Sequence, residues 1–261
     1  MTKTEKLVKS MHTKEEYIAV FDSGVGGVSV LRELVKLMPG ERYLYFGDSA
    51  NAPYGAKSTE QVRELTLQAA EKLLERGVKA LVVACNTATA AAINDLREKY
   101  PHEIIIGIEP AVKLAADSCS GGHIGVMATA VTLREEKFNH LLERFPDVQV
   151  YPICPAELVA LIEKGASEEE LETYLRPVLA DYVGKLDAVV LGCTHYPFAS
   201  AVIGKILGDK TRILDGGEGT ARETKRRLVE KDLLFDGPGE VQMENSSADA
   251  AILSRAMELL R

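Results

Sequence analysis

Residues 80–89 read ALVVACNTAT, and the rest of the chain is organised around this stretch. Its first five residues are apolar and include two valines, which is typical of a strand buried on both faces of a parallel sheet. The apolar run ends at Cys85, and an alanine-rich segment that favours a helix begins at Ala88. Because open α/β folds bind ligands at the carboxyl ends of their parallel strands, we expect Cys85 to lie at a ligand-binding edge.

The same pattern occurs again in the second half of the chain. Residues 188–197 read AVVLGCTHYP, so a second buried strand ends at Cys193, 108 residues after Cys85. Residues 17–23 (YIAVFDS) and 123–129 (HIGVMAT) form another pair of strand ends, offset by 106 residues. The nearly equal offsets favour an internal duplication in which each half supplies one wall of a shared cleft. The alternative is that any two strand–loop–helix units look alike.

Predicted strands and helices alternate along the chain, which indicates right-handed βαβ crossovers and parallel sheets. We expect strands at residues 17–21, 42–46, 80–84, 104–108, 123–128, 148–153, 187–191 and 211–214. Helical patterns lie at about 27–38, 58–76, 87–99, 110–118, 131–145, 156–164, 168–184, 198–208, 217–230 and 248–260. The sequence therefore predicts an α/β fold of two similar parallel-sheet domains.

No low-complexity linker divides the chain, so the domain boundary is placed from the repeat, near Glu109–Pro110. The last helices follow the second repeat, and we expect them to pack back on the first half. The prediction is a first domain of residues 17–109 plus 220–261 and a second domain of residues 110–219. Residues 1–16 are interpreted as a flexible tail, because they lack the apolar segment of a signal peptide.

Composition excludes several classes of function. The chain of 261 residues has 31 Lys and Arg against 39 Asp and Glu, and it shows no dense basic patch, which argues against a nucleic-acid surface. No apolar run approaches the roughly 18 residues of a membrane span. Four cysteines lie at positions 85, 119, 154 and 193 without a Cys-x-x-Cys pair. Without a signal peptide, we expect free thiols in a reducing cytoplasm.

Two thiols at equivalent strand ends suggest proton transfer. A thiolate is a good general base when a neighbouring group lowers its pKa from about 8.5. Two thiols on opposite sides of a substrate carbon could remove a proton from one face and return one to the other, which is racemisation without a cofactor. Asn86, Thr87 and Thr194 follow the two cysteines and could bind the substrate carboxylate. The alternative for each cysteine alone is a small buried hydrophobic residue.

Other polar residues also follow predicted strands. Asp22 could accept a hydrogen bond from a substrate ammonium or move a proton to and from Cys85, or it could serve as an ordinary helix N-cap. His195 could stabilise a Cys193 thiolate, or it could make a structural hydrogen bond. Residues 47–55 form a polar loop longer than a simple connector needs, which favours a binding role. The glycines at 24–27 lack the Gly-x-Gly-x-x-Gly spacing of a dinucleotide site.

Several motifs together resemble the aspartate/glutamate racemase family. They are FDSGVGG (21–27), PYG (53–55), ACNTAT (84–89), GIEP (107–110) and GCTHYP (192–197), and they cover most of the chain in the family's order. The combination of Asp-Ser, Pro-Tyr-Gly and Cys-Thr-His-Tyr-Pro is similar to the glutamate branch rather than the aspartate branch. The resemblance implies two α/β domains related by a pseudo-twofold axis, with the active site in the cleft between them.

The resemblance also implies an activity and its setting. It implies that L-glutamate is converted to D-glutamate for peptidoglycan synthesis, and hence for cell-wall biogenesis and cell shape, in the bacterial cytoplasm. It implies no cofactor and no metal, a homodimer, and no nucleic-acid or membrane partner. Three alternatives to this activity remain. The chain could racemise aspartate or another small amino acid, it could be a non-catalytic glutamate-binding module, or its two thiols could form a reversible redox pair.

Site residues are carried over from the matching motifs. Cys85 would take the α-proton from D-glutamate with the help of Asp22, and Cys193 would take it from L-glutamate with the help of His195. A further site glutamate follows Cys154-Pro155; the apolar run before Glu163 fits it best, and Glu157 is the alternative. The substrate would be held by Asp22, Ser23, Pro53, Tyr54, Gly55, Asn86, Thr87, Thr129, Thr194 and His195. Asp48 matches an acid near the site, Cys154 could lie near it, and Cys119 is interpreted as structural.

Overall fold

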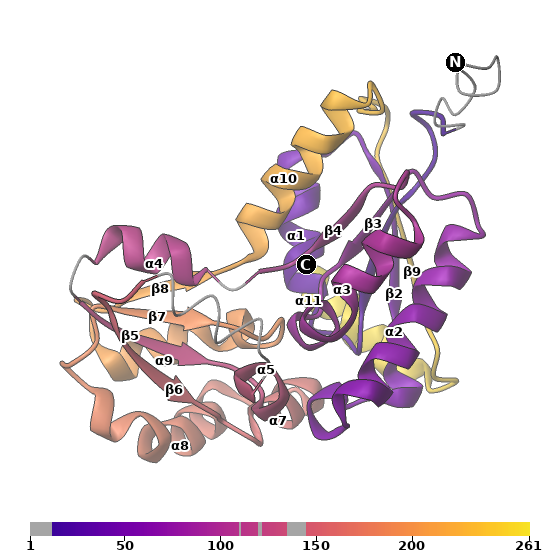
Figure 1. The fold of residues 1–261 in the computed structure, drawn as a ribbon. Coiled ribbons are helices and arrows are strands. Elements are labelled where there is room, and N and C mark those ends of the chain that lie inside the picture. Colours follow the sequence, from indigo (N-terminus) through magenta and orange to yellow (C-terminus); the bar gives the residue numbers. More distant parts are fainter. Residues whose placement is uncertain (1–11, 110, 120–121, 135–144) are drawn as a thin grey trace.

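The computed structural model describes residues 12–109, 111–119, 122–134 and 145–261 (Figure 1). Within these ranges the strands form two sheets, in the orders β4-β3-β1-β2-β9 and β6-β5-β7-β8. Every strand pair in both sheets is parallel. Each sheet lies in its own lobe, which confirms the predicted fold of two parallel-sheet α/β units.

Most predicted elements occur within a few residues of their expected bounds. The strands are β1 (Ile18–Asp22), β2 (Arg42–Gly47), β3 (Ala80–Val83), β4 (Ile105–Gly107), β5 (His123–Met127), β6 (Gln149–Ile153), β7 (Ala188–Leu191), β8 (Arg212–Asp215) and β9 (Glu240–Asn245). The helices are α1 (Val28–Leu37), α2 (Thr59–Leu74), α3 (Asn86–Lys99), α4 (Val112–Ser118), α5 (Ala130–Arg134), α7 (Leu158–Lys164), α8 (Glu168–Leu179), α9 (Ser200–Leu207), α10 (Gly217–Glu230) and α11 (Ala250–Leu260). Short 3-10 turns occupy 49–51, 54–56, 180–182 and 196–199.

Two differences from the predicted elements have physical reasons. Strand β9 was not expected, because its sequence EVQMEN carries charged and amide side chains at alternate positions; only the alternation of Val241 and Met243 signals an edge strand. The helix predicted over 168–184 ends at Leu179 and continues as a 3-10 turn. Most of the helix predicted over 131–145 lies outside the described residues, as do residues 1–11 of the predicted tail and Pro110 of the predicted boundary.

Both faces of the first sheet are buried at its centre, along β1 and β3. Along β1, Ile18 and Val20 belong to the core beneath α1, α10 and α11, while Ala19 and Phe21 belong to the core beneath α2 and α3. All five residues of the strand are buried. This explains why β1 and β3 read as continuous apolar runs rather than as alternating strands.

The second sheet repeats this arrangement. Ile124 and Val126 of β5 pack with α4 on one face, and Val189 and Leu191 of β7 pack with α7, α8 and α9 on the other. Its strand order, β8-β7-β5-β6, is the same as β4-β3-β1-β2 in the first sheet. Identical order with parallel pairing is what a duplication predicts, and it places Cys85 and Cys193 after equivalent strands, β3 and β7.

The C-terminal segment returns to the first lobe. Strand β9 pairs with β2, and helices α10 and α11 pack against α1. We therefore propose the domain division of residues 17–109 plus 220–261 and 110–219, with the crossing at the start of α10. The described end of the tail also contacts this lobe, where His12 lies 2.8 Å from Glu103. Over the described ranges, no helix combines the length and apolar character needed to cross a membrane.

Candidate active site

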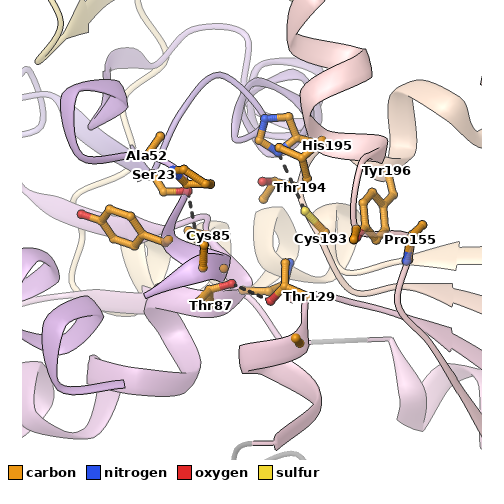
Figure 2. Close-up of a pocket in the computed structure, with 18 of the residues that line it drawn as sticks. Ser23, Ala52, Cys85, Thr87, Thr129, Pro155, Cys193, Thr194, His195 and Tyr196 are labelled. Carbon is orange, nitrogen blue, oxygen red and sulfur yellow. Dashed lines mark hydrogen bonds between the residues drawn. The ribbon is translucent and has the colours of Figure 1, made fainter. Parts of the chain in front are cut away.

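The carboxyl ends of the two sheets face each other across a cavity of about 230 Å³ (Figure 2). In each sheet the cavity lies beside the central pair of strands, β1 with β3 and β5 with β7, where the direction of chain crossover changes. Twelve of the predicted site residues line the cavity: Ser23, Pro53, Tyr54, Gly55, Cys85, Asn86, Thr87, Thr129, Glu163, Cys193, Thr194 and His195. Asp22 is the one predicted site residue that does not line the cavity.

Cys85 is the N-cap of α3 and is 5% exposed. Its Sγ accepts a hydrogen bond from the Ala88 amide at 3.4 Å and donates one to the Ser23 hydroxyl at 3.5 Å (Figure 2). Burial, and then the negative charge of Asp22, raise the pKa of the Cys85 thiol to about 12. The group at this wall is therefore a neutral thiol that can donate a proton.

Cys193 belongs to a chain of polar groups on the opposite wall. Its Sγ lies 3.8 Å from Nδ1 of His195, whose Nε2 lies 2.9 Å from Oε1 of Glu163. Burial acts to lower the pKa of His195, but the hydrogen bonds with Cys193 and Glu163 outweigh it and raise that pKa to about 10. An imidazolium beside the sulfur stabilises a thiolate, so the geometry favours a base at Cys193.

The position of Glu163 distinguishes the two candidate glutamates. Glu163 lines the cavity and bonds His195 from the last turn of α7. Glu157 precedes α7, and its backbone amide bonds the Tyr174 hydroxyl at 3.1 Å, away from the cavity wall. Of the two, only Glu163 is placed to act on the histidine.

Asp22 lies behind the wall rather than in it. Its carboxylate is fully buried and accepts hydrogen bonds from the Gly24 amide at 3.0 Å and the Thr194 hydroxyl at 3.1 Å. Burial raises the pKa of this carboxyl, against the opposing charge of His195 and these hydrogen bonds. Asp22 therefore joins the two lobes through Thr194, and its charge acts on Cys85.

Asn86 is the polar side chain with the most unused hydrogen-bonding capacity in the wall. It is 5% exposed, and neither Oδ1 nor Nδ2 has a hydrogen-bond partner among the described residues. Thr87 and Thr129, from opposite lobes, also line the cavity, with their hydroxyls 3.1 Å apart (Figure 2). Buried polar groups in folded proteins are almost always paired, so an unpaired amide in a cavity wall indicates a ligand.

The polar loop after β2 closes one side of the cavity. The Tyr54 hydroxyl donates to Oδ2 of Asp48 at 2.7 Å, and the amide of Asn51 donates to the same carboxylate. Asp48 does not line the cavity. Its carboxylate instead fixes the loop that presents Pro53, Tyr54 and Gly55 to the cavity. The binding role predicted for the loop therefore applies to these three residues.

The glycine-rich turn after β1 allows the two lobes to approach closely. A Cβ on Gly26 would lie 2.3 Å from Nδ1 of His195, and a Cβ on Gly24 would lie 2.8 Å from Oε1 of Glu163. Real Cβ atoms do not approach other atoms so closely, so a side chain at Gly26 would displace the buried His195 ring, and one at Gly24 would displace the Glu163 carboxylate. The turn therefore serves contact with the opposite lobe, consistent with its lack of the dinucleotide spacing.

Some wall and supporting residues carried no clear signal in the sequence. The hydroxyl of Ser29, in α1, donates to the Thr194 carbonyl at 2.8 Å, and only the fold brings these residues together. Val159 lines the cavity as an ordinary apolar residue. Cys154, predicted as a residue near the site, also lines it, whereas Cys119 lies outside the wall beside Ser118.

Comparisons with known proteins agree on one family. Residues 18–224 match the family model described as Asp/Glu/Hydantoin racemase. The chain is 48% identical over 255 residues to the glutamate racemase of Clostridium botulinum, which covers 96% of this chain and 99% of that protein. It is similar to the crystal structure of glutamate racemase from Thermus thermophilus in complex with beta-chloro-D-alanine (36% identity, TM-score 0.82, 95% and 94% of the two chains).

A second solved structure carries a bound amino acid. It is the crystal structure of Escherichia coli glutamate racemase in complex with L-glutamate and the activator UDP-MurNAc-Ala. This chain is 32% identical to it with a TM-score of 0.82, over 94% of this chain and 92% of that one.

Proposed function

The chain belongs to the aspartate/glutamate/hydantoin racemase family, and from this premise we propose that it interconverts L-glutamate and D-glutamate by proton transfer between two thiols. It is an amino-acid racemase, and so an isomerase. The observation that carries the two-thiol mechanism is the pair Cys85 and Cys193. They follow equivalent strands of the two sheets and line one cavity from opposite walls.

For L-glutamate, the Cys193 thiolate removes the α-proton while His195 remains an imidazolium. The C–H bond breaks, an S–H bond forms at Cys193, and the electron pair passes into the substrate carboxylate. The neutral thiol of Cys85 then donates its proton to the other face of the carbon, which gives D-glutamate and leaves a thiolate at Cys85. D-glutamate reacts from this second protonation state in the reverse order. The raised pKa of Cys85 and the Cys193–His195–Glu163 chain support this assignment of acid and base.

The substrate carboxylate needs donors, because charge develops on its oxygens as the α-proton leaves. We place this carboxylate at the N-terminus of α3, where backbone amides and the unpaired amide of Asn86 are available. Thr87 and Thr129 supply hydroxyls from the two lobes. Ser23, Thr194 and the loop residues Pro53, Tyr54 and Gly55 complete the enclosure. No cofactor takes part in this scheme.

The setting of the reaction is part of the proposal. D-Glutamate would be supplied for peptidoglycan, in the cytoplasm, by a homodimer. The family resemblance supports these points, and the L-glutamate complex of the Escherichia coli relative supports the substrate.

The decisive experiment incubates the pure protein with L-glutamate in deuterated water without added cofactor. Optical rotation and α-carbon deuterium are followed together by polarimetry and NMR. We expect rotation to fall to zero while deuterium appears in D-glutamate. Exchange with aspartate but not with glutamate would keep the mechanism and change the substrate. Binding of glutamate without any exchange would instead indicate a non-catalytic binding module.

A further inference from the structure

The C-terminal helix α11 contacts the end of α7 in the opposite lobe. Ala256 and Leu259 anchor α11 in the core of the first lobe. From the same helix, Nη2 of Arg255 donates to the Ile162 carbonyl at 3.0 Å, and Nη1 donates to Oε2 of Glu258 at 3.2 Å. Arg255 is thus held by its own helix while it bonds the backbone of α7.

The bond is made at the last turn of α7, where helix carbonyls have few partners within the helix. Gly165 caps this helix in the left-handed conformation, and its amide bonds the same Ile162 carbonyl. A Cβ at Gly165 would lie 3.7 Å from Cζ of Arg255, so the guanidinium packs directly against the helix end. A cation here also complements the negative end of the helix dipole.

Glu163 is the residue that follows this carbonyl, and it is the partner of His195. Its side chain is 36% exposed, and a cavity of about 770 Å³ opens beside both Glu163 and Arg255. Side-chain packing therefore does little to fix the Glu163 carboxylate. The position of its backbone, which is set by the last turn of α7, decides whether Oε1 reaches Nε2 of His195.

We propose that Arg255 is a positioning residue, which holds the end of α7 so that Glu163 stays hydrogen-bonded to His195 and keeps Cys193 ready to act as a base. This inference rests on the proposed function. The Nε atom of Arg255 is buried and has no partner among the described residues. Its two Nη atoms make the contacts that hold the end of α7 and Glu258.

The test compares Arg255→Ala, Arg255→Lys and Glu163→Ala with the double variant. Wild-type activity is measured first, because its absence would reject the proposed function without bearing on Arg255. We expect Arg255→Ala to lower kcat about tenfold with little change in KM, since it loses one charge-assisted hydrogen bond. Arg255→Lys keeps a donor and should recover part of the loss. Arg226→Ala, an exposed arginine of α10, is the control and should keep wild-type kcat.

The double variant separates positioning from general stabilisation. If Arg255 acts through Glu163, its removal should lower kcat by less than about twofold in the Glu163→Ala background. A second readout does not depend on turnover: alkylation by iodoacetamide, followed by mass spectrometry, should slow at Cys193 but not at Cys85 in Arg255→Ala. Multiplicative losses in the double variant, or an unchanged Cys193 alkylation rate, would overturn the inference.

Discussion

The carboxylate of Asp22 accepts a hydrogen bond from the hydroxyl of Thr194 at 3.1 Å, although the two residues are 172 positions apart and lie in different lobes. Both side chains are buried, at 0% and 4% exposure. Thr194 is the neighbour of Cys193, and the charge of Asp22 raises the pKa of Cys85. One hydrogen bond therefore connects the surroundings of both thiols and joins the two walls of the cavity.

Replacing Asp22 by Asn tests this connection. Asn keeps the shape but removes the negative charge that helps to raise the Cys85 pKa, so that pKa should fall. We expect the pH profile of Cys85 alkylation to move to lower pH. Racemisation of D-glutamate should slow, because a Cys85 thiolate of lower pKa is a weaker base for the α-proton. Asp95→Asn, which alters a surface ion pair with Arg63, is the control. An unmoved alkylation profile would show that Asp22 does not act on Cys85.

Single replacement of either thiol should stop racemisation. Cys85→Ser and Cys193→Ser each remove one of the two proton carriers, and a positioned acid or base typically contributes at least about a hundredfold in rate. Racemisation is followed by polarimetry, and circular dichroism checks the fold. Cys119→Ser, outside the cavity wall, should keep full activity. Full racemisation by either site variant would contradict the two-base scheme.

Gly26→Ala should prevent the lobes from meeting without unfolding either one. The added Cβ would lie 2.3 Å from Nδ1 of His195, so the histidine or the whole lobe must move. We expect kcat/KM to fall at least about tenfold, because small misplacements of catalytic groups have large effects on rate. Gly219→Ala is the matched control, since a Cβ there meets nothing within 4 Å. Equal activity of the two variants would mean that the close approach is unimportant.

The raised pKa of His195 predicts a fall in stability with rising pH. The folded protein holds this proton up to a pKa of about 10, whereas the unfolded chain releases it near 6.5, so the folded state binds more protons between these values. The stabilisation is fully present below pH 6.5 and is lost as pH rises through about 10. Urea unfolding between pH 6.5 and about 8, below the ordinary pKa of a thiol in the unfolded chain, should show the first part of this loss.

His195→Gln should remove most of this fall in the free energy of unfolding with rising pH. In the wild-type protein we expect the whole fall to be on the order of a few kcal/mol. The groups that face the histidine are Cys193, Glu163 and Asp22. His102→Gln, at an exposed position, should keep the wild-type slope. A histidine variant with an unchanged slope would assign the pH dependence to other groups.

Local patterns in the sequence were enough to predict most elements. Buried parallel strands must be apolar on both faces, so 80–84 and 188–191 could be recognised from residue type alone. Helix α2 begins with a capping box between Ser58 and Gln61, and both of its hydrogen bonds are present; a motif of this kind lies within four adjacent residues. Strand β9 was missed because an edge strand needs only one apolar face, and its charged residues hide that face.

Site residues that lie close together in the sequence could be predicted. Those that act through contacts between distant parts of the chain could not. Cys85 with Asn86, and Cys193 with His195, are neighbours in the chain, and the structure brings them to one cavity. The choice of Glu163 over Glu157 required the geometry of α7, because both glutamates stand at reasonable spacing after Cys154.

The sequence by itself determined most of the strands, their parallel arrangement, the repeat, and the two thiols that follow equivalent strands, because each depends on residue type over short stretches of chain. Only the tertiary structure decided that Asp22 lies behind the wall, that Gly26 must have no side chain, and that Arg255 reaches the end of α7. These contacts join residues far apart in the chain across two separately folded sheets. Their distances depend on how the lobes pack, which no local pattern encodes.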